Sequence, residues 1–365
     1  MPLKTTAGNH GAAAKGRGAT INPEGRFEKW NRDVADDGWF QAPEEEPARP
    51  KTIIAIERAK SIISHNDSPD LGFSQSLNPY RGCEHGCGYC YSRPSHGYLG
   101  LSPGIDFETR IFAKTNAADL LREELSRPGY RCENLVIGVN TDAYQPAERE
   151  HKITRAVLEV CSEANQPIGV ITKSALIERD IDILGPMAKK RLVSTTITIT
   201  TLDHDVARYT EPRASAPARR LLAIERLAAA GIPVNVNVAP VIPFLTDSEL
   251  ESILEACAKA GASSAAYTLL RLPWEVKDIF RAILEQRFPL KAAHVMSRVH
   301  EMREGRDNDP NFGSRMKGTG MFAELLKQRF HKACARLGLN KRESAFDLDT
   351  TQFRPPGPKG QGSLF

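Results

Sequence analysis

The pattern of apolar and polar residues along the middle of the chain alternates between two periods. Short runs rich in Val, Ile and Thr predict β-strands, because branched side chains pack well on a pleated surface. Segments with apolar residues three and four positions apart predict amphipathic helices. The predicted strands are a segment leading into residue 78 and residues 134–140, 168–173, 192–200, 234–242 and 263–273. The predicted helices are residues 151–165, 181–191, 218–231 and 247–261, with Pro186 as a candidate break.

Strands that alternate with helices imply parallel strands joined by right-handed crossovers. A closed barrel of this kind has eight strand–helix units, whereas this pattern contains about six. We therefore expect an α/β fold, a partial (βα)6 TIM-type barrel over residues 51–275, with a loop at residues 78–93 after its first strand. Helical periodicity continues beyond the barrel and predicts a helical extension over residues 276–345.

The two ends of the chain have a different composition. Residues 1–50 are rich in Gly, Ala, Pro and charged side chains, which predicts a mostly disordered arm. Residues 346–365 include RPPGPKG, where Pro and Gly recur too often for a helix or a central strand. We expect this segment to be a flexible tail.

Composition and charge limit the classes of protein to consider. The chain has 365 residues, of which 41% are hydrophobic, so it can bury a large core. Its net charge of +4 is compatible with a nucleic-acid partner without establishing one. There is no apolar run of the roughly 18 residues that suggest a membrane span, and the first residues lack the apolar stretch of a secretory signal. We therefore expect a cytoplasmic protein with no membrane partner and with reduced cysteines.

Three of the seven cysteines lie close together in the stretch RGCEHGCGYC, at Cys83, Cys87 and Cys90. In a reducing compartment, clustered cysteines indicate a metal or catalytic site rather than disulfides. Three thiolates can hold an iron–sulfur cluster. A zinc site would need a fourth ligand, for which His85 and His96 are available. A zinc site, however, would not account for the strand–helix units that follow.

Polar residues also follow the other predicted strands. In an α/β barrel the carboxyl ends of the strands carry the chemistry, because they all open at the same face. We therefore expect these residues to face one cavity together with the cysteines. They are Asn140, Thr141, Asp142, Lys173, Thr198 and Thr200, and Ala239-Pro240 ends the fifth strand at the same face.

The spacing C-x3-C-x2-C, with Tyr89 before the third cysteine, resembles the radical S-adenosylmethionine (SAM) superfamily. Within it, the sequence is most similar to the branch that contains spore photoproduct lyase. That similarity covers roughly residues 76–275, through NPYRGCEHGCGYCYSR, TDAYQPAE, VITK, EPR and APVIP. The whole chain is more similar still to a group of bacterial radical SAM proteins, and this likeness extends through FGSRMKGTGMF.

The resemblance implies a 4Fe-4S cluster on Cys83, Cys87 and Cys90, which act as metal ligands and as catalytic residues. It implies that SAM is cleaved reductively to a 5′-deoxyadenosyl radical, with an electron donor such as flavodoxin or ferredoxin. It also implies that Tyr89 lies against the adenine. Further SAM contacts would come from Thr141, Lys173, Thr198, Thr200, Glu211 and the backbone near Ala239.

Each residue carried over in this way also has a simpler explanation. Lys173 could be a solvated strand end, and Glu211 could cap a helix or pair with Arg213. The threonines could simply favour a strand. Their agreement with the cysteine loop favours the SAM-binding interpretation for the set.

One feature departs from the spore photoproduct lyase pattern. Those enzymes use a cysteine at the end of the second strand as a hydrogen donor, whereas this chain has VNTD at residues 139–142. Cys132 precedes that strand and is expected at the opposite end of the barrel. Tyr144 and Tyr267 are alternative candidates for the donor. We therefore expect a radical SAM enzyme, lyase-like or transferase-like, with a different substrate.

The segment QGSLF, residues 361–365, resembles the pentapeptide by which bacterial DNA polymerases and repair proteins bind the sliding clamp. Leu364 and Phe365 would fill an apolar pocket of the clamp, and Gln361 would form hydrogen bonds at its edge. Basic residues near the C-terminus would contact phosphates or form a solvated helical face. They are Arg315, Lys317, Lys327, Arg329 and Lys332.

Three hypotheses follow from the sequence. The first is a radical SAM enzyme that abstracts hydrogen from a DNA-related substrate, in a repair-like reaction. The second is a non-catalytic iron–sulfur or zinc DNA-binding module recruited to the sliding clamp. The third is a radical SAM enzyme that acts on a protein or a small molecule. Formation of 5′-deoxyadenosine separates the second hypothesis from the others.

Overall fold

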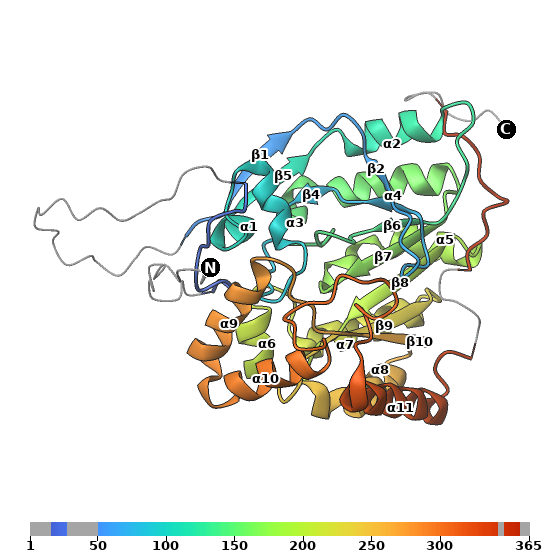
Figure 1. The fold of residues 1–365 in the computed structure, drawn as a ribbon. Helices are drawn as coiled ribbons and strands as arrows, with labels where there is room; N and C mark the ends of the chain where they lie inside the picture. The colour runs from blue at the N-terminus through green and yellow to red at the C-terminus, as the bar shows by residue number, and fades with distance from the viewer. Residues whose placement is uncertain (1–15, 28–49, 342–346, 358–365) are drawn as a thin grey trace, which may run out of the picture.

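The computed structural model of the chain describes residues 16–27, 50–341 and 347–357, and is built around a seven-stranded sheet (Figure 1). Its strand order is β10-β9-β8-β7-β6-β3-β2. The strands from β3 to β10 run parallel, and β2 joins the edge antiparallel to β3. The bounds are β2 Ile63–His65, β3 Gln75–Leu77, β6 Leu135–Ile137, β7 Ile168–Thr172, β8 Val193–Thr198, β9 Val234–Val241 and β10 Ser264–Leu269. The expected partial barrel with six parallel strands is confirmed.

Helices connect successive parallel strands and cover the outside of the sheet. The connecting helices are α4 Ile153–Glu163, α5 Ile181–Lys189, α7 Pro217–Ala229 and α8 Leu250–Lys259. Pro186 does not break α5. It follows Gly185, which has no Cβ to collide with the proline ring, so the helix continues through it.

The two faces of β9 differ in polarity. Val234, Val236 and Val238 belong to the main apolar core. Asn235 and Asn237 alternate with them and therefore point to the opposite face, inside the barrel. Asn237 Oδ1 and, on β8, Ser194 Oγ are buried without a hydrogen-bond partner among the described residues. The inside of the barrel is thus polar.

A second, three-stranded sheet carries the cysteine loop, and sequence reasoning did not predict it. Its order is β1-β5-β4, with β1 Ile53–Glu57, β4 Tyr80–Arg81 and β5 Arg110–Lys114. Two more helices flank β5, namely α1 Ile105–Thr109 and α2 Ala117–Leu125. The loop therefore leaves the main sheet after β3 and begins from a separate small sheet.

The C-terminal extension is helical, as expected, with α9 Val276–Arg287, α10 Pro289–Glu301 and α11 Gly320–Leu337. The loop between α10 and α11 extends the edge of the main sheet, because Leu269 N donates to Met316 O at 3.0 Å. Arg315 in this loop binds Asp70 and Ser68, which precede β3. The loop thus links the two edges of the open sheet.

These contacts change the interpretation of the C-terminal basic residues. Arg315 pairs with Asp70, Arg329 pairs with Glu251, and Lys327 lies 3.2 Å from Glu324. A side chain held by a carboxylate is less available to a phosphate. The solvated-face interpretation therefore suits Arg329 and Lys327, and Arg315 is a structural residue.

Two terminal segments are packed rather than free. Residues 16–27 were expected to belong to a disordered arm, yet Ala19 is fully buried against Ile279 and Ile283. Residues 347–357 were expected to be flexible, yet Arg354 N donates to Ala164 O at 2.9 Å. Composition alone misjudged both, because a polar segment can be held by main-chain hydrogen bonds. The clamp-like residues Gln361, Leu364 and Phe365 lie outside the described residues.

No helix in the described part of the chain is long and apolar enough to cross a membrane.

Candidate active site

The three clustered cysteines lie on one loop that its neighbours hold through main-chain hydrogen bonds. Cys83 N donates to Phe107 O at 2.9 Å, and Gly88 N donates to Thr210 O at 3.0 Å. Cys83 and Cys87 are buried, and Cys90 is partly buried. Gly86 has φ +66°, a backbone conformation that glycine adopts without strain. The loop is therefore shaped by the fold itself.

A buried ion pair holds the main chain of this loop in place. Arg93 Nη2 lies 2.5 Å from Glu108 Oε1, and both side chains are fully buried. Arg93 also donates to the carbonyl oxygens of Gly86, at 3.1 Å, and Cys87, at 2.9 Å. One guanidinium thus fixes the main chain between the first and second cysteines.

The N-terminal segment closes over the same brace. Gly18 N and Ala19 N donate to the two carboxylate oxygens of Glu108, at 2.9 and 2.7 Å. A Cβ on Gly18 would lie 1.6 Å from Gly86 O, so only glycine fits against the loop here. Residues 17–19, which we name the N-terminal strap, are therefore part of the loop's packing.

A second buried ion pair gathers several of the side chains that sequence reasoning assigned to SAM. Glu211 pairs with Arg220, and it also accepts hydrogen bonds from Tyr89 Oη and Thr200 Oγ1. Thr200 Oγ1 also lies 3.0 Å from Ala239 O. Arg220 reaches the carbonyl oxygen of Thr198 at 3.0 Å. These residues come from the cysteine loop, β8, β9 and the helices after β8, yet they form one bonded group.

The charge of Glu211 is stabilised by its partners. Burial alone would raise the pKa of its carboxyl, but Arg220 and Lys173 outweigh that effect and lower the pKa to about 2. Lys173 Nζ lies 5.9 Å from the centre of the Tyr89 ring. The pair that forms is Glu211–Arg220, and Arg213 binds Glu84 instead.

Asp142 forms a third centre beside the first cysteine. It accepts hydrogen bonds from Lys173 N and Thr172 Oγ1, both at 2.7 Å, and lies 3.3 Å from His85 Nδ1. The hydroxyl of Thr141 donates to Tyr80 O at 2.9 Å, and its contact with SAM stays a prediction. Its hydroxyl proton is thus used within the protein, at the point where the cysteine loop begins.

The donor set fits an iron–sulfur cluster better than zinc. Burial raises the pKa of the Cys83 and Cys87 thiols, the latter to about 12, so their thiolates need a bound cation. Three thiolates, each bound to its own iron, complete the protein ligands of such a cluster, whereas a structural zinc site takes four protein ligands.

The two histidines considered as a fourth zinc ligand have other partners. His96 Nε2 lies 3.0 Å from Arg110 O, and its ring packs edge-on against Phe107. His85 faces Asp142. His85 is thus held by a carboxylate, whereas Nδ1 of His96 is buried without a hydrogen-bond partner among the described residues.

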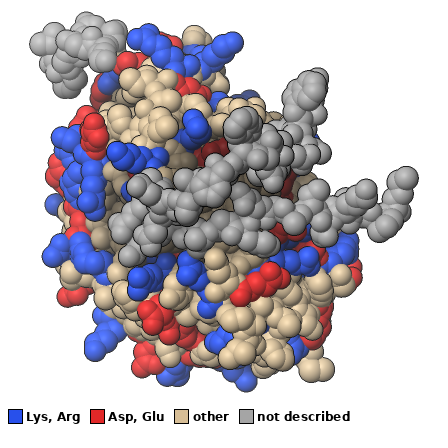
Figure 2. Space-filling view, turned by 90° about the vertical axis from the view of Figure 1, so that its left-hand side faces the viewer, with Lys and Arg blue, Asp and Glu red and all other residues tan. Residues whose placement is uncertain are grey.

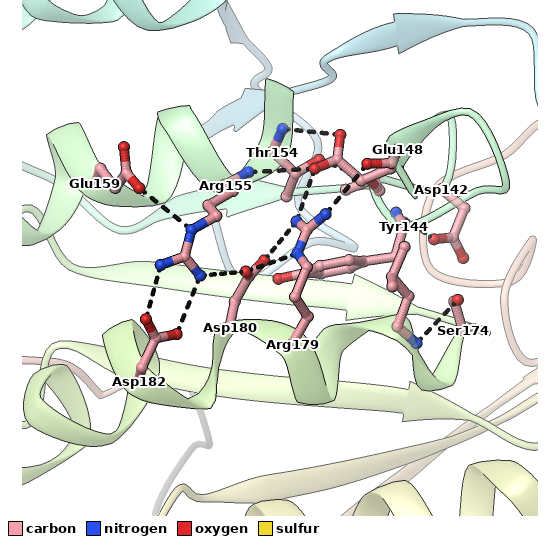
Figure 3. A network of polar contacts seen from close by, with 12 residues as sticks. Asp142, Tyr144, Glu148, Thr154, Arg155, Glu159, Ser174, Arg179, Asp180 and Asp182 are labelled. Carbon is pink, nitrogen blue, oxygen red and sulfur yellow. Dashed lines mark hydrogen bonds and ion pairs between the residues drawn. The ribbon is translucent and has the colours of Figure 1, made fainter. Parts of the chain in front are cut away.

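The candidate hydrogen donors do not face the cysteines. Tyr144 lies against Arg179, whose Cζ is 5.9 Å from the ring, within a network that joins Arg179 to Glu148 and Asp180 (Figure 3). Tyr267 packs on Phe330 of α11 with ring centres 4.7 Å apart. Cys132 lies before β6, 3.7 Å from Gln166 Oε1, as expected for the opposite end of the barrel. The two tyrosine suggestions therefore lose their geometric support.

Sequence reasoning missed four residues that organise this region. Arg93 and Glu108 brace the loop, Arg220 neutralises Glu211, and Asn237 presents an unpartnered oxygen inside the barrel. The alternation in VNVNV could have indicated Asn237, because its polar residues share one face. The other three carry no local signal.

The comparisons with known proteins agree with this geometry. The family model described as Radical SAM superfamily matches residues 77–257. An uncharacterized protein of Mycobacterium tuberculosis is 35% identical over 272 residues, which cover 74% of this chain and 76% of the relative. An uncharacterized protein of Methanocaldococcus jannaschii is 26% identical over 197 residues, 54% of this chain and 70% of the relative. The chain belongs to the radical SAM superfamily.

Solved structures show the same fold. Spore photoproduct lyase complexed with dinucleoside spore photoproduct superposes with a TM-score of 0.57 at 14% identity, over 78% of this chain and 80% of that one. A double mutant of that enzyme, solved with bound AdoMet and dinucleoside spore photoproduct, gives 0.57 at 15% identity, over 83% and 86%. The family implies a 4Fe-4S cluster and SAM as cofactors. The arrangement is thus a radical SAM fold with its cysteine loop held in place.

Proposed function

We propose that the chain is a radical SAM enzyme whose cluster is held by Cys83, Cys87 and Cys90 and whose substrate is a nucleic acid. When bound, the cluster supplies the electron that cleaves SAM to methionine and a 5′-deoxyadenosyl radical. The observation that carries the proposal is the bonded group of Glu211, Arg220, Tyr89 and Thr200 directly beside the cysteine loop. These residues belong to the set that the family resemblance assigned to SAM, apart from Arg220.

The chain's own residues would bind and orient the cofactor. Glu211 holds the Tyr89 hydroxyl, so the ring keeps one orientation next to Lys173. Arg220 keeps Glu211 ionised, and both are buried away from water. Asn237 Oδ1, on the residue paired with Thr198 at the carboxyl end of β8, supplies an unpartnered acceptor within the described part of the barrel. Exclusion of water protects a reactive radical from side reactions.

Two observations support a nucleic-acid substrate. Spore photoproduct lyase, which shares the fold, has been solved with a dinucleoside spore photoproduct. On the side where α6 (His204–Thr210) and α9 lie in Figure 1, separate groups of Lys and Arg side chains are exposed among Asp and Glu (Figure 2). Exposed cations can contact phosphates without selecting a sequence. The missing cysteine after β6 argues for a lesion or modification other than spore photoproduct.

The test is formation of 5′-deoxyadenosine by the anaerobically reconstituted protein with SAM and a strong reductant. We expect product that requires the three cysteines and that rises with UV-damaged DNA. The control is the protein with Cys83, Cys87 and Cys90 all changed to Ala. A correctly formed cluster that gives no product above this control would instead support a DNA-binding module without turnover.

The tail proposal is tested separately from catalysis. We infer that Gln361, Leu364 and Phe365 bind the bacterial sliding clamp, on the sequence resemblance alone. A peptide of the last residues should bind purified clamp, and Leu364→Ala with Phe365→Ala should abolish that binding. Unchanged affinity of the double variant would remove the clamp from the list of partners.

A further inference from the structure

Arg271 lies at the mouth of the barrel, and neither the sequence pattern nor the proposed function gives it a role. It follows β10 by two residues, at the carboxyl end of the strand, where barrel sites are built. Its charge interacts with Tyr91, which directly follows Cys90. Tyr91 is 45% exposed and donates to Val139 O, just beyond the end of β6. Arg271 therefore stands between the cysteine loop and the loop that closes the barrel.

The guanidinium of Arg271 donates to no oxygen atom among the described residues. Its partner is the thioether of Met316, with Nη1 3.6 Å from Sδ, and sulfur is a weak acceptor. Its Nε is buried and has no partner in the part of the chain that the structure describes. An arginine carries five N–H donors, and leaving them unpaired in a half-buried position costs free energy.

Two neighbouring arginines show what a structural role looks like in this region. Arg303 is buried and donates to Leu270 O at 2.9 Å and Ser314 O at 3.1 Å, so it ties main chains together. Arg315 is held by Asp70 and Ser68. Arg271 lies among the same loops but makes neither kind of bond.

The electrostatic surroundings of Arg271 favour an incoming anion. Burial and then the like charge of Arg315 lower the pKa of Arg271, so its charged form is destabilised in the free protein. Tyr91, Asp70 and Asp309 offset part of this effect on the pKa. Neither carboxylate bonds Arg271, because Asp70 binds Arg315 and Asp309 accepts a hydrogen bond from Ser314. An anionic oxygen group placed against the guanidinium would relieve this destabilisation.

We propose that Arg271 is the receptor for an oxyanion at the barrel mouth, and that this group is a phosphate of the nucleic-acid substrate. The planar guanidinium can form two parallel hydrogen bonds to phosphate oxygens, which positions the backbone of a nucleic acid next to the cysteine loop. The SAM carboxylate has the same chemistry and is the second source of such a group. This inference rests on the proposed function, because it assigns a substrate contact to the same site.

The experiment compares two affinities in the cluster-loaded protein. Binding of a short DNA oligonucleotide is measured by fluorescence anisotropy across a salt series, and binding of SAM by calorimetry. For Arg271→Gln we expect about a tenfold loss of oligonucleotide affinity and a salt slope reduced by about one. Arg271→Lys keeps the charge but loses the planar guanidinium. Its oligonucleotide affinity should lie between those of the wild type and Arg271→Gln.

The matched control is Arg306→Gln, which removes an exposed arginine paired with Glu304 on the same C-terminal side. A weaker SAM affinity in Arg271→Gln would assign the oxyanion to the cofactor. Oligonucleotide and SAM affinities equal to those of Arg306→Gln would overturn the inference.

Thermal unfolding separates a receptor from a structural residue. Loss of an unpaired, half-buried cation should leave the Tm of Arg271→Gln unchanged or raised, because binding residues often cost stability. A large fall in Tm would show that Arg271 supports the fold and would count against a receptor. SAM cleavage by the wild-type protein is measured in parallel. Its absence overturns the proposed function, whereas intact cleavage with unchanged affinities overturns the inference alone.

Discussion

Two buried arginine–glutamate pairs flank the cysteine loop, and they differ in what completes their hydrogen bonds. Arg93 and Glu108 are surrounded by main-chain groups, from Gly86 and Cys87 on one side and Gly18 and Ala19 on the other. Arg220 and Glu211 are joined to the side chains of Tyr89 and Thr200, as well as to the carbonyl oxygens of Thr198 and Ser215. The first pair fixes backbone, and the second fixes side chains that face the proposed SAM site.

This difference separates two tasks that buried ion pairs can perform. A pair saturated by the backbone defines the shape of a loop, and its loss should be felt as instability. A pair that shares its charge with a tyrosine and a threonine orders a binding surface, and its loss should be felt as reduced affinity too. Removing one partner of either pair leaves an uncompensated buried charge.

The largest expected effect comes from Arg93→Met. This change leaves Glu108 buried without its cation and the carbonyls of Gly86 and Cys87 without their donor. We expect the free energy of unfolding to fall by about 4 kcal/mol, together with a loss of iron bound per chain. Urea unfolding and iron analysis measure the two effects. Arg110→Met, which removes an exposed partner of Asp106, is the control and should cost less than about 1 kcal/mol.

Glu211→Gln should mainly weaken SAM binding, whereas Arg93→Met should mainly reduce stability and iron content. The side chain keeps its shape, but Arg220 loses its counter-charge and Tyr89 loses an ionised acceptor. We expect a loss of about 3 kcal/mol in the free energy of unfolding, near-normal iron content and at least a tenfold weaker affinity for SAM. Calorimetry on cluster-loaded protein provides the affinity. Loss of iron in this variant, with normal SAM affinity in the molecules that keep their cluster, would show that the Glu211 pair has the same role as the Arg93 pair.

The pH dependence of stability sharpens the comparison further. The pKa of Glu211 is lowered from its ordinary value of 4.5 to about 2 in the folded protein. The unfolded chain therefore binds its proton first as the pH falls, so this contribution is present above about pH 4.5 and is lost between pH 4.5 and 2. It amounts to about 3 kcal/mol.

Urea titrations of apo-protein at a series of pH values test this expectation. Glu211→Gln should have a flatter acid limb than the wild type, because it has no carboxyl to protonate. An unchanged acid limb would show that other groups dominate acid unfolding and that the pKa of Glu211 is not lowered in the folded protein as described above.

The smallest of these effects should come from Gly18→Ala. The new Cβ would collide with Gly86 O, and the N-terminal strap must move away from Glu108. We expect a loss of about 2 kcal/mol and faster bleaching of the cluster absorbance in air. Gly72→Ala is the matched control, because a Cβ there meets nothing within 4 Å. Equal bleaching rates for the two variants would mean that the strap does not shield the cluster.

The long elements of the barrel could be predicted from sequence because each carries its own period. β9 was expected at residues 234–242 and spans Val234–Val241, and α7 was expected at residues 218–231 and spans Pro217–Ala229. The small sheet could not be predicted in this way. β4 has two residues, too few to show a period, and its partner β5 lies far along the chain, so no local pattern indicates their pairing.

The residues of the candidate site also divide into those that the sequence indicated and those that it did not. Spacing alone indicated the three cysteines, and family resemblance indicated Tyr89, Thr200 and Glu211. Arg93 and Arg220 gave no such signal, because an arginine in a helical or loop pattern is usually exposed. Only the folded chain shows each one fully enclosed beside a carboxylate. Arg271 is recognisable by a missing partner, which no linear pattern records.

The packing of residues 347–357 also limits the distance between the barrel and a partner bound to the end of the chain. Arg122 Nη1, on α2, donates to Gly357 O at 2.9 Å, so the last described residue is fastened to the back of the barrel. Leu364 is seven residues further along the chain, so it can lie at most about 25 Å from Gly357. Figure 1 shows α2 on the side away from α6 and α9. A sliding clamp bound to the tail would therefore lie on the α2 side of the protein and would leave the mouth of the barrel accessible to substrate.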